Sequence, residues 1–193
     1  LPAELYGQQS ANSKGLDLEN DSELAQLNQT AQQFAKHQWS AAPMGEHIQT
    51  NDAVAPQSII NPARHTDVVG YVQEATTEQV EQALNNAQAV QDIWARTAKD
   101  TRASYLLRAA DLMEARLEEL MVLLCRESGK TYANAIAEVR EAVDFLRYYA
   151  TQMIDLDANA EVEPLGTMLC ISAWNFPLAI FTGQVAAALV AGN

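Results

Sequence analysis

Between two stretches with almost no polar side chains, the sequence places Trp174, Asn175 and Phe176 side by side, followed at once by Pro177. Burying an unpaired amide costs about 1–3 kcal/mol, so Asn175 must either be hydrogen-bonded or serve a ligand. An apolar strand that opens into a helix is where α/β proteins bind ligands, at the carboxyl end of the strand. There Asn175 would donate to an oxygen and Trp174 would form a flat wall. In the alternative interpretation Asn175 caps the next helix and Trp174 packs in the core, and the residues alone favour neither.

Other candidate motifs are weaker. The run SGKT at residues 128–131 ends like a phosphate-binding loop, but the glycine that this pattern requires five residues before Gly129 is Leu124. We therefore interpret residues 128–131 as a break between helices. The pattern GxGxxG is absent and the three histidines are scattered, so we expect neither an ordinary dinucleotide fingerprint nor a metal site.

Charge and cysteine usage limit the possible partners. The chain has 25 acidic and 12 basic residues and a formal net charge of −13, which repels nucleic acids and anionic membrane surfaces. Cys125 and Cys170 lie in apolar runs without metal-type spacing, as expected for reduced structural thiols of a cytoplasmic protein. The apolar run 178–190 is too short to span a bilayer. No signal peptide or initiator methionine opens the sequence, and we expect it to be part of a longer polypeptide.

Hydrophobic spacing predicts a chain made mostly of long helices. The first helix is expected over residues 21–37. A second follows the capping box at 76–79, with Val80, Leu84, Ala87 and Ile93 in one stripe up to Trp94. A third, capped by Asp100, runs to the break at 128–131, and its continuation reaches about residue 154 with the charges of AEVREAVDF on the opposite, polar face.

Strands are predicted in two places. Ser58–Ile60 and Val68–Val72 flank a turn with Asn61-Pro62, which indicates a β-hairpin. Thr167–Ser172 is a short apolar run typical of a strand buried in a parallel sheet, and the apolar helix 178–190, stopped by Gly192, follows it. Because a lone parallel strand has no partner, most of this sheet should lie outside the chain.

Three segments resemble the aldehyde dehydrogenase superfamily. EPLGTMLCISAWNFPLAIFTGQVAAALVAGN resembles its first nucleotide-binding strand and helix, and SIINPARHTDVVGYVQEAT resembles its amino-terminal hairpin. RESGKTYANAIAEVREAVDFLRYYA narrows the resemblance to the Δ1-pyrroline-5-carboxylate (glutamate semialdehyde) dehydrogenase domain of bacterial bifunctional proline utilisation A proteins. ELYG and NSKGLDLEN resemble the stretch that joins this domain to the proline dehydrogenase domain.

The resemblance covers essentially the whole chain and implies an α/β fold. We expect an aldehyde dehydrogenase-like fragment of long helices, an amino-terminal β-hairpin, and the first strand and helix of a Rossmann-like nucleotide-binding domain. Residues 1–56 would form an arm, a helix and a linker. Residues 57–193 would form the first part of an NAD-binding domain, without the catalytic domain.

The resemblance also implies a chemistry. In this family a cysteine thiolate attacks the aldehyde, hydride passes to NAD+, and water activated by a glutamate releases the acid, here glutamate. Asn175 matches the donor to the oxyanion, Phe176 a residue that lines the substrate pocket, and Glu141 a residue near the substrate. The stretch along the nicotinamide-ribose side of NAD+ is matched by Ile171, Ser172, Ala173 and Trp174. Relatives usually have proline at position 173, which puts the rigidity of this loop in doubt.

The nucleophile and the catalytic glutamate of the family lie beyond the position of Asn193, and neither Cys125 nor Cys170 matches the nucleophile. We therefore expect this chain to be inactive alone. The parent protein is expected to be a cytoplasmic homo-oligomer, with any contact to the inner membrane made through other domains. Its expected partners are a small-molecule substrate and the FAD-binding proline dehydrogenase domain of the same polypeptide. The competing hypothesis is a non-catalytic, acidic helical scaffold.

Overall fold

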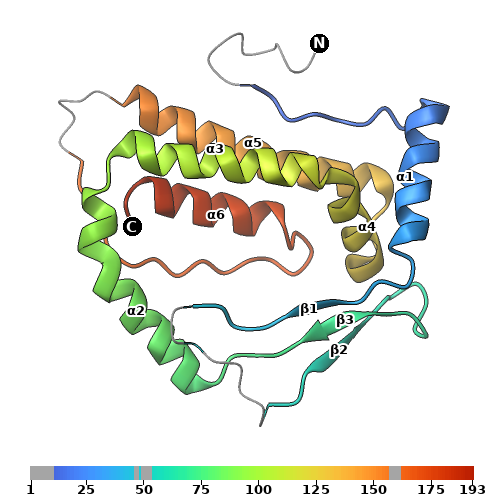
Figure 1. Ribbon diagram of the computed structural model, residues 1–193, viewed down its shortest axis with the longest axis horizontal. Coiled ribbons are helices and arrows are strands. Elements are labelled where there is room, and N and C mark those ends of the chain that lie inside the picture. The colour runs from blue at the N-terminus through green and yellow to red at the C-terminus, as the bar shows by residue number, and fades with distance from the viewer. Residues whose placement is uncertain (1–10, 46–47, 49–53, 157–161) are drawn as a thin grey trace.

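The computed structural model describes residues 11–45, 48, 54–156 and 162–193. Figure 1 shows α3 (Lys99–Ala115) and α5 (Tyr132–Asp155) side by side, with α6 (Ala179–Val190) packed beneath them. A small sheet lies on the far side of α6, and an extended segment, residues 162–173, runs between that sheet and α6. We call α3, α5 and α6 the helical layer, and the extended segment before α6 runs along it.

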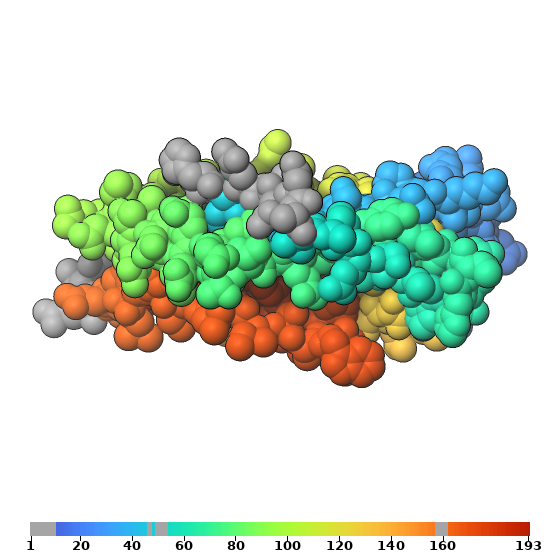
Figure 2. All heavy atoms as spheres, turned by 90° about the horizontal axis from the view of Figure 1, so that it is seen from below, coloured from blue at the N-terminus to red at the C-terminus, as the bar shows by residue number. Residues whose placement is uncertain are grey.

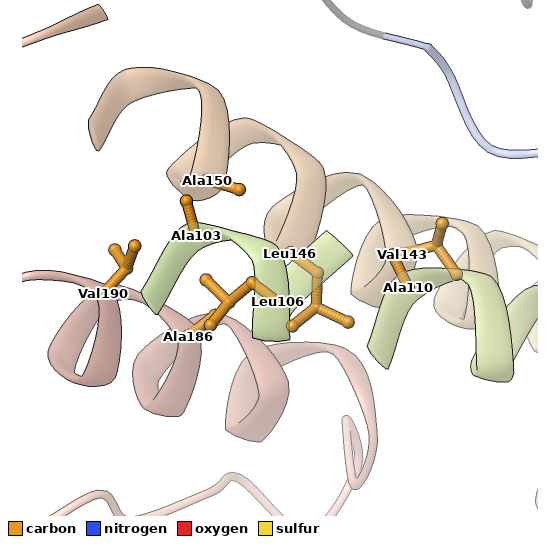
Figure 3. Packing of buried hydrophobic residues seen from close by; sticks show 8 residues of the cluster. All are labelled: Ala103, Leu106, Ala110, Val143, Leu146, Ala150, Ala186 and Val190. Atoms are coloured by element: carbon orange, nitrogen blue, oxygen red, sulfur yellow. The ribbon is translucent and has the colours of Figure 1, made fainter. Parts of the chain in front are cut away.

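The core of this layer is built from small and branched side chains of α3, α5 and α6. Figure 3 shows how they interdigitate: Ala103, Leu106, Ala110, Val143, Leu146, Ala150, Ala186 and Val190. A second buried cluster joins α1 (Asp21–Gln33), α4 (Leu117–Ser128) and α5. The helical spacing predicted for residues 106–146 is confirmed, since Leu106, Ala110, Val139 and Val143 are all buried.

The helix boundaries differ from prediction at three points. α1 begins at Asp21 as expected but ends at Gln33, before His37. The helix expected to start with a cap at Asp100 already begins at Lys99, so Asp100 lies inside its first turn, where a carboxylate favours the helix dipole. The same predicted helix is divided at Arg116 into α3 and α4.

Three helix ends follow the sequence signals closely. Thr76 and Gln79 form the predicted capping box of α2 (Thr77–Arg96). Gly129 ends α4 in the left-handed region with φ 68°, a conformation that favours glycine. Thr131 then caps α5 by accepting a hydrogen bond from the Asn134 N–H at 3.2 Å. The interpretation of residues 128–131 as a helix break is confirmed.

The sheet has the order β1-β3-β2. β2 (Gln57–Ile60) and β3 (Val68–Val72) pair antiparallel, which confirms the predicted hairpin. β1 (Trp39–Ala41) pairs parallel with β3 and begins where the linker was expected. A Cβ atom at Gly70 would lie 2.2 Å from the Trp39 carbonyl oxygen, so this close pairing requires glycine. Parts of that linker, residues 46–47 and 49–53, and the motif ELYG lie outside the described residues.

The strand predicted at Thr167–Ser172 is wrong for this structure. The segment is extended, but no strand is formed by the described residues between 162 and 178. A strand needs ladder hydrogen bonds from a neighbour, and here the main-chain N–H groups of Leu165 and Gly166 donate instead to the Asn193 Oδ1 atom, at 2.6 and 3.0 Å.

Apolar side chains remain exposed along one face of the molecule. We define the open face as the exposed apolar side chains of α2 and of residues 162–174; they include Val80, Leu84, Ile93, Leu165, Leu169, Ile171 and Trp174. Figure 2 shows this side, with the extended segment (orange) as a strip beside α2 (green). The stripe predicted for α2 is present, but none of the α2 residues is buried.

Candidate active-site loop

The predicted site residues Ile171 to Phe176 form one loop between the extended segment and α6. The Phe176 N–H donates to the Ala173 carbonyl at 3.1 Å and closes a tight turn around Trp174 and Asn175. The Trp174 side chain is 87% exposed, so packing of this indole in the core is excluded for the described structure. Asn175 is exposed as well. The loop presents both side chains outward.

The alternative role of Asn175 as a helix cap is wrong. The N-cap of α6 is Leu178, and this end of the helix has no capping bond from its own N-cap side chain. Instead the Glu138 Oε1 atom accepts hydrogen bonds from the N–H groups of Leu178, at 2.9 Å, and Ala179, at 3.4 Å. A carboxylate from α5 thus satisfies the first main-chain donors of α6 and complements the positive end of its dipole.

Lys130 holds the loop from the other side. Its Nζ atom lies 2.8 Å from Glu138 Oε2 and donates to the Asn175 carbonyl oxygen, also at 2.8 Å. The same ammonium group lies 4.8 Å from the centroid of the Phe176 ring, which is a cation–π distance. Lys130 therefore holds the main chain of Asn175, while the amide side chain stays exposed.

Glu138 and Lys130 were missed at the level of the sequence. Glu138 was expected on the charged outer face of its helix, and this is wrong, because only 2% of the residue is exposed. A signal was present: Glu138 lies three residues after Ala135 and four before Ala142, both buried, and so shares their face of the helix. Lys130 was considered only as part of a phosphate-loop pattern.

Glu141 lies one turn after Glu138 on α5 and is exposed. It belongs to the helix that anchors the loop. The structure thus gathers Ile171, Ser172, Ala173, Trp174, Asn175 and Phe176 on one loop, and it places Glu141 on the neighbouring helix.

A hollow lies away from Asn175. It is a pocket of about 510 Å³ between α2, the extended segment and α6, with an almost wholly apolar lining that includes Val90, Trp94, Met168, Cys170 and Phe181. None of the predicted site residues lines it.

Cys125 lies elsewhere, in α4. Burial raises the pKa of the Cys125 thiol, which lowers its thiolate fraction and fits a structural cysteine.

The described residues contain neither a membrane-spanning helix nor a cluster of metal ligands. None of their helices combines the length and apolar character needed to cross a membrane. No group of three or more His, Cys, Asp or Glu side chains in this part of the chain is arranged to hold a metal ion.

Comparison with known proteins places this geometry in a family. Over all 193 residues the chain is 53% identical to the bifunctional protein PutA of Escherichia coli (strain K12), of which it covers 14%. It is 38% identical over 176 residues to the 1-pyrroline-5-carboxylate dehydrogenase of Anoxybacillus flavithermus (strain DSM 21510 / WK1), covering 85% of this chain and 34% of that protein.

A solved structure agrees with these sequence relatives. 1-Pyrroline-5-carboxylate dehydrogenase from Thermus with bound NAD matches at a TM-score of 0.85 and 28% identity, over 94% of this chain and 38% of that one. The predicted α/β class, mostly helical with a small sheet, is confirmed. The sequence model of the aldehyde dehydrogenase family matches residues 48–193, which include the hairpin, the helical layer and the Asn175 loop. The chain belongs to the aldehyde dehydrogenase family.

Proposed function

We propose that this chain is the first part of an NAD-dependent dehydrogenase that oxidises L-glutamate γ-semialdehyde, the open form of 1-pyrroline-5-carboxylate, to glutamate. The parent polypeptide would also carry a proline dehydrogenase domain, with FAD bound there, so that both steps of proline catabolism lie in one protein. The 53% identity to a bifunctional PutA over the whole chain supports this assignment. The single structural observation that carries it is the exposed amide of Asn175 on a loop whose main chain is fixed.

Asn175 is proposed to donate a hydrogen bond to the oxyanion that forms when the aldehyde is attacked. Such a donor works best when it is oriented before the reaction, because no energy is then spent on turning it. The Phe176 ring beside it would line the substrate pocket, and Glu141 would lie near the substrate. The attacking cysteine and the general-base glutamate are proposed to lie outside this chain, which would be inactive alone.

The loop is also suited to one wall of a cofactor site. Ile171, Ser172 and Trp174 are exposed, and residues 170–183 contain no acidic side chain. If NAD+ is bound there, the chemistry it would supply is acceptance of a hydride. The loop residues would hold the nicotinamide-ribose side in place, with the Trp174 indole as a flat surface and the main chain of 171–173 as the source of polar contacts.

The test uses the parent polypeptide and Asn175→Ala. We expect kcat for NADH formation from 1-pyrroline-5-carboxylate to fall about 10²–10³-fold, as for loss of other oxyanion donors. The affinity for NAD+, measured by titration of intrinsic fluorescence, should stay nearly unchanged, because the lost bond forms mainly in the transition state.

The matched control is Asn85→Ala, which removes the same side chain from an exposed position of α2. It should leave kcat unchanged. A parent polypeptide that forms no NADH would contradict the dehydrogenase assignment and favour a scaffold. An Asn175→Ala variant with normal kcat would contradict the oxyanion role alone.

A further inference from the structure

The buried ion pair of Lys130 and Glu138 joins three separate parts of the chain. Lys130 lies in the link between α4 and α5, Glu138 lies in the second turn of α5, and both contact the loop before α6. The side chains are 14% and 1% exposed. No motif in the sequence had indicated this cluster as a unit.

Stability alone is a weak reason for such a pair. Taking two charges out of water costs several kcal/mol, and well-packed apolar residues of similar volume often replace a buried ion pair without loss of stability. What distinguishes this pair is that each partner has a second partner on the same loop. The Lys130 ammonium bonds the Asn175 carbonyl, and the second oxygen of Glu138 accepts from Leu178 and Ala179.

These contacts fix the loop on both sides of Pro177. The Asn175 carbonyl is held before it and the Leu178 N–H after it, so the chain between them has little freedom. The Asn175 carbonyl carbon and the Asn175 side chain are attached to the same Cα atom, so displacing the carbonyl moves the side chain with it. A shift of the Lys130 ammonium would therefore turn the amide of Asn175.

We propose that Lys130 and Glu138 are positioning residues that preorganise Asn175 as the oxyanion donor. The inference rests on the proposed function and deepens it. Neither residue needs to touch the substrate. Their effect on the reaction would pass entirely through the orientation of the Asn175 amide, and a donor misplaced by about 1 Å is enough to slow a reaction about 10²-fold.

The test is a double-mutant cycle in the parent polypeptide. Lys130→Met combined with Glu138→Gln removes both charges, so no unpaired buried charge remains, and the glutamine oxygen can still accept from Leu178. The bond to the Asn175 carbonyl is lost. We expect kcat to fall about 10–100-fold with the KM for NAD+ nearly unchanged. In an Asn175→Ala background the same pair of substitutions should lower kcat no further, because there is no amide left to orient.

A second buried ion pair serves as the control. Arg126 and Asp67, with side chains 9% and 8% exposed, join α4 to the hairpin and do not contact the loop. Arg126→Met with Asp67→Asn should lower the melting temperature and leave kcat unchanged. Lys130→Arg keeps a cation with several donors and should retain more kcat than Lys130→Met; this variant enters the same cycle if the double variant does not fold.

Three results separate the possibilities. A loss of kcat that disappears in the Asn175→Ala background supports positioning. A loss that multiplies with that of Asn175→Ala, or a lower melting temperature with normal kcat, overturns it and leaves the oxyanion role of Asn175 intact. A normal kcat for Asn175→Ala alone overturns the oxyanion role and the positioning role together.

Discussion

The helical layer and the open face contain the same kinds of side chain but differ in what covers them. Val143 in α5 is 0% exposed because α3 and α6 pack against it, whereas Leu169 in the extended segment is 81% exposed. Leu169 lies in an apolar run of the sequence, and Val143 lies on the apolar face of an amphipathic helix. The difference shows that an apolar side chain becomes buried only where a neighbouring element packs against it.

Hydrogen bonding explains why the two regions divide in this way. A helix satisfies its main-chain groups internally, so α3, α5 and α6 need each other only for their side chains. An extended segment satisfies its main chain only beside another strand. In the described residues the sheet β1-β3-β2 does not include residues 162–173. We expect partner strands from the rest of the parent polypeptide, since the chain spans 14% of its E. coli relative.

The largest expected contrast comes from removing the same side chain in each region. Leu146 lies in the core cluster, and Leu146→Ala in the 193-residue chain should lower the free energy of unfolding by about 2–5 kcal/mol. Leu169→Ala is the matched control and should change it by less than about 0.5 kcal/mol. Urea unfolding followed by circular dichroism measures both.

Repeating the pair of substitutions in the parent polypeptide sharpens the contrast. If partner strands cover the extended segment there, Leu169→Ala should cost about 2 kcal/mol or more. Equal costs for Leu146→Ala and Leu169→Ala in the 193-residue chain would mean that the open face is already covered, and the comparison would fail.

The second prediction concerns the buried ion pair of Asp67 and Arg126, which joins the hairpin to α4. Asp67 accepts hydrogen bonds from Arg126, at 2.7 and 3.3 Å, and from the Asn61 side chain, at 3.0 Å, with Arg64 3.4 Å away. Asp67→Asn leaves the Arg126 guanidinium without its anion and should cost about 3 kcal/mol at neutral pH. Glu119→Gln, which breaks the pair with the exposed Arg116, should cost less than about 1 kcal/mol.

The same contact predicts a pH dependence. The hydrogen bond from Arg126, followed by that from Asn61, holds the pKa of Asp67 well below its usual range. A depressed folded-state pKa means that the stabilisation is fully present above the unfolded-state pKa of about 3.9 and is lost as the pH falls below it. Thermal melts from pH 6 to about pH 2 should therefore show a smaller acid loss in Asp67→Asn than in the unsubstituted chain; parallel curves would contradict the role of Asp67.

The sequence predicted the helices and the hairpin because their signals are local. The 3.6-residue spacing, the Thr76–Gln79 capping box and Gly129 each determine structure within a few residues. β1 was missed because it has three residues and its partner β3 follows 29 residues later. The strand at 167–172 was predicted from its apolar composition. Composition does not show whether a neighbouring strand is present to pair with it.

Asn175 was identified as a candidate site residue from the sequence, but the two residues that hold its loop, Lys130 and Glu138, were not. An amide between two apolar runs can be recognised from the sequence alone. Glu138 and Lys130 lie 37 and 45 residues before Asn175, and nothing local indicates that they meet it. The apolar residues around Glu138 on its own helix were the available sign that this carboxylate has a buried partner.

The smallest expected effect is at Ala173, where the loop joins the open face. Relatives of this family usually have proline there, and proline fixes φ near −65° while removing the N–H donor. The carbonyl of Ala173, which accepts from the Phe176 N–H, would keep its bond. Ala173→Pro in the parent should then raise the free energy of unfolding by about 0.4–1 kcal/mol, because the unfolded chain loses freedom.

The matched control is Ala191→Pro, since the Ala191 N–H donates to the Ala187 carbonyl at 3.3 Å and proline would remove that bond. It should lower the melting temperature, whereas Ala173→Pro should raise it and leave the KM for NAD+ the same or lower. Proline also holds the preceding residue extended, and Ser172 already lies in an extended, non-helical stretch. A lower melting temperature for Ala173→Pro would mean that the loop departs from the shape of its proline-bearing relatives. Ser172, Ala173 and Trp174 would then lose their proposed place beside NAD+, while Asn175, held through its own carbonyl by Lys130, would keep its role.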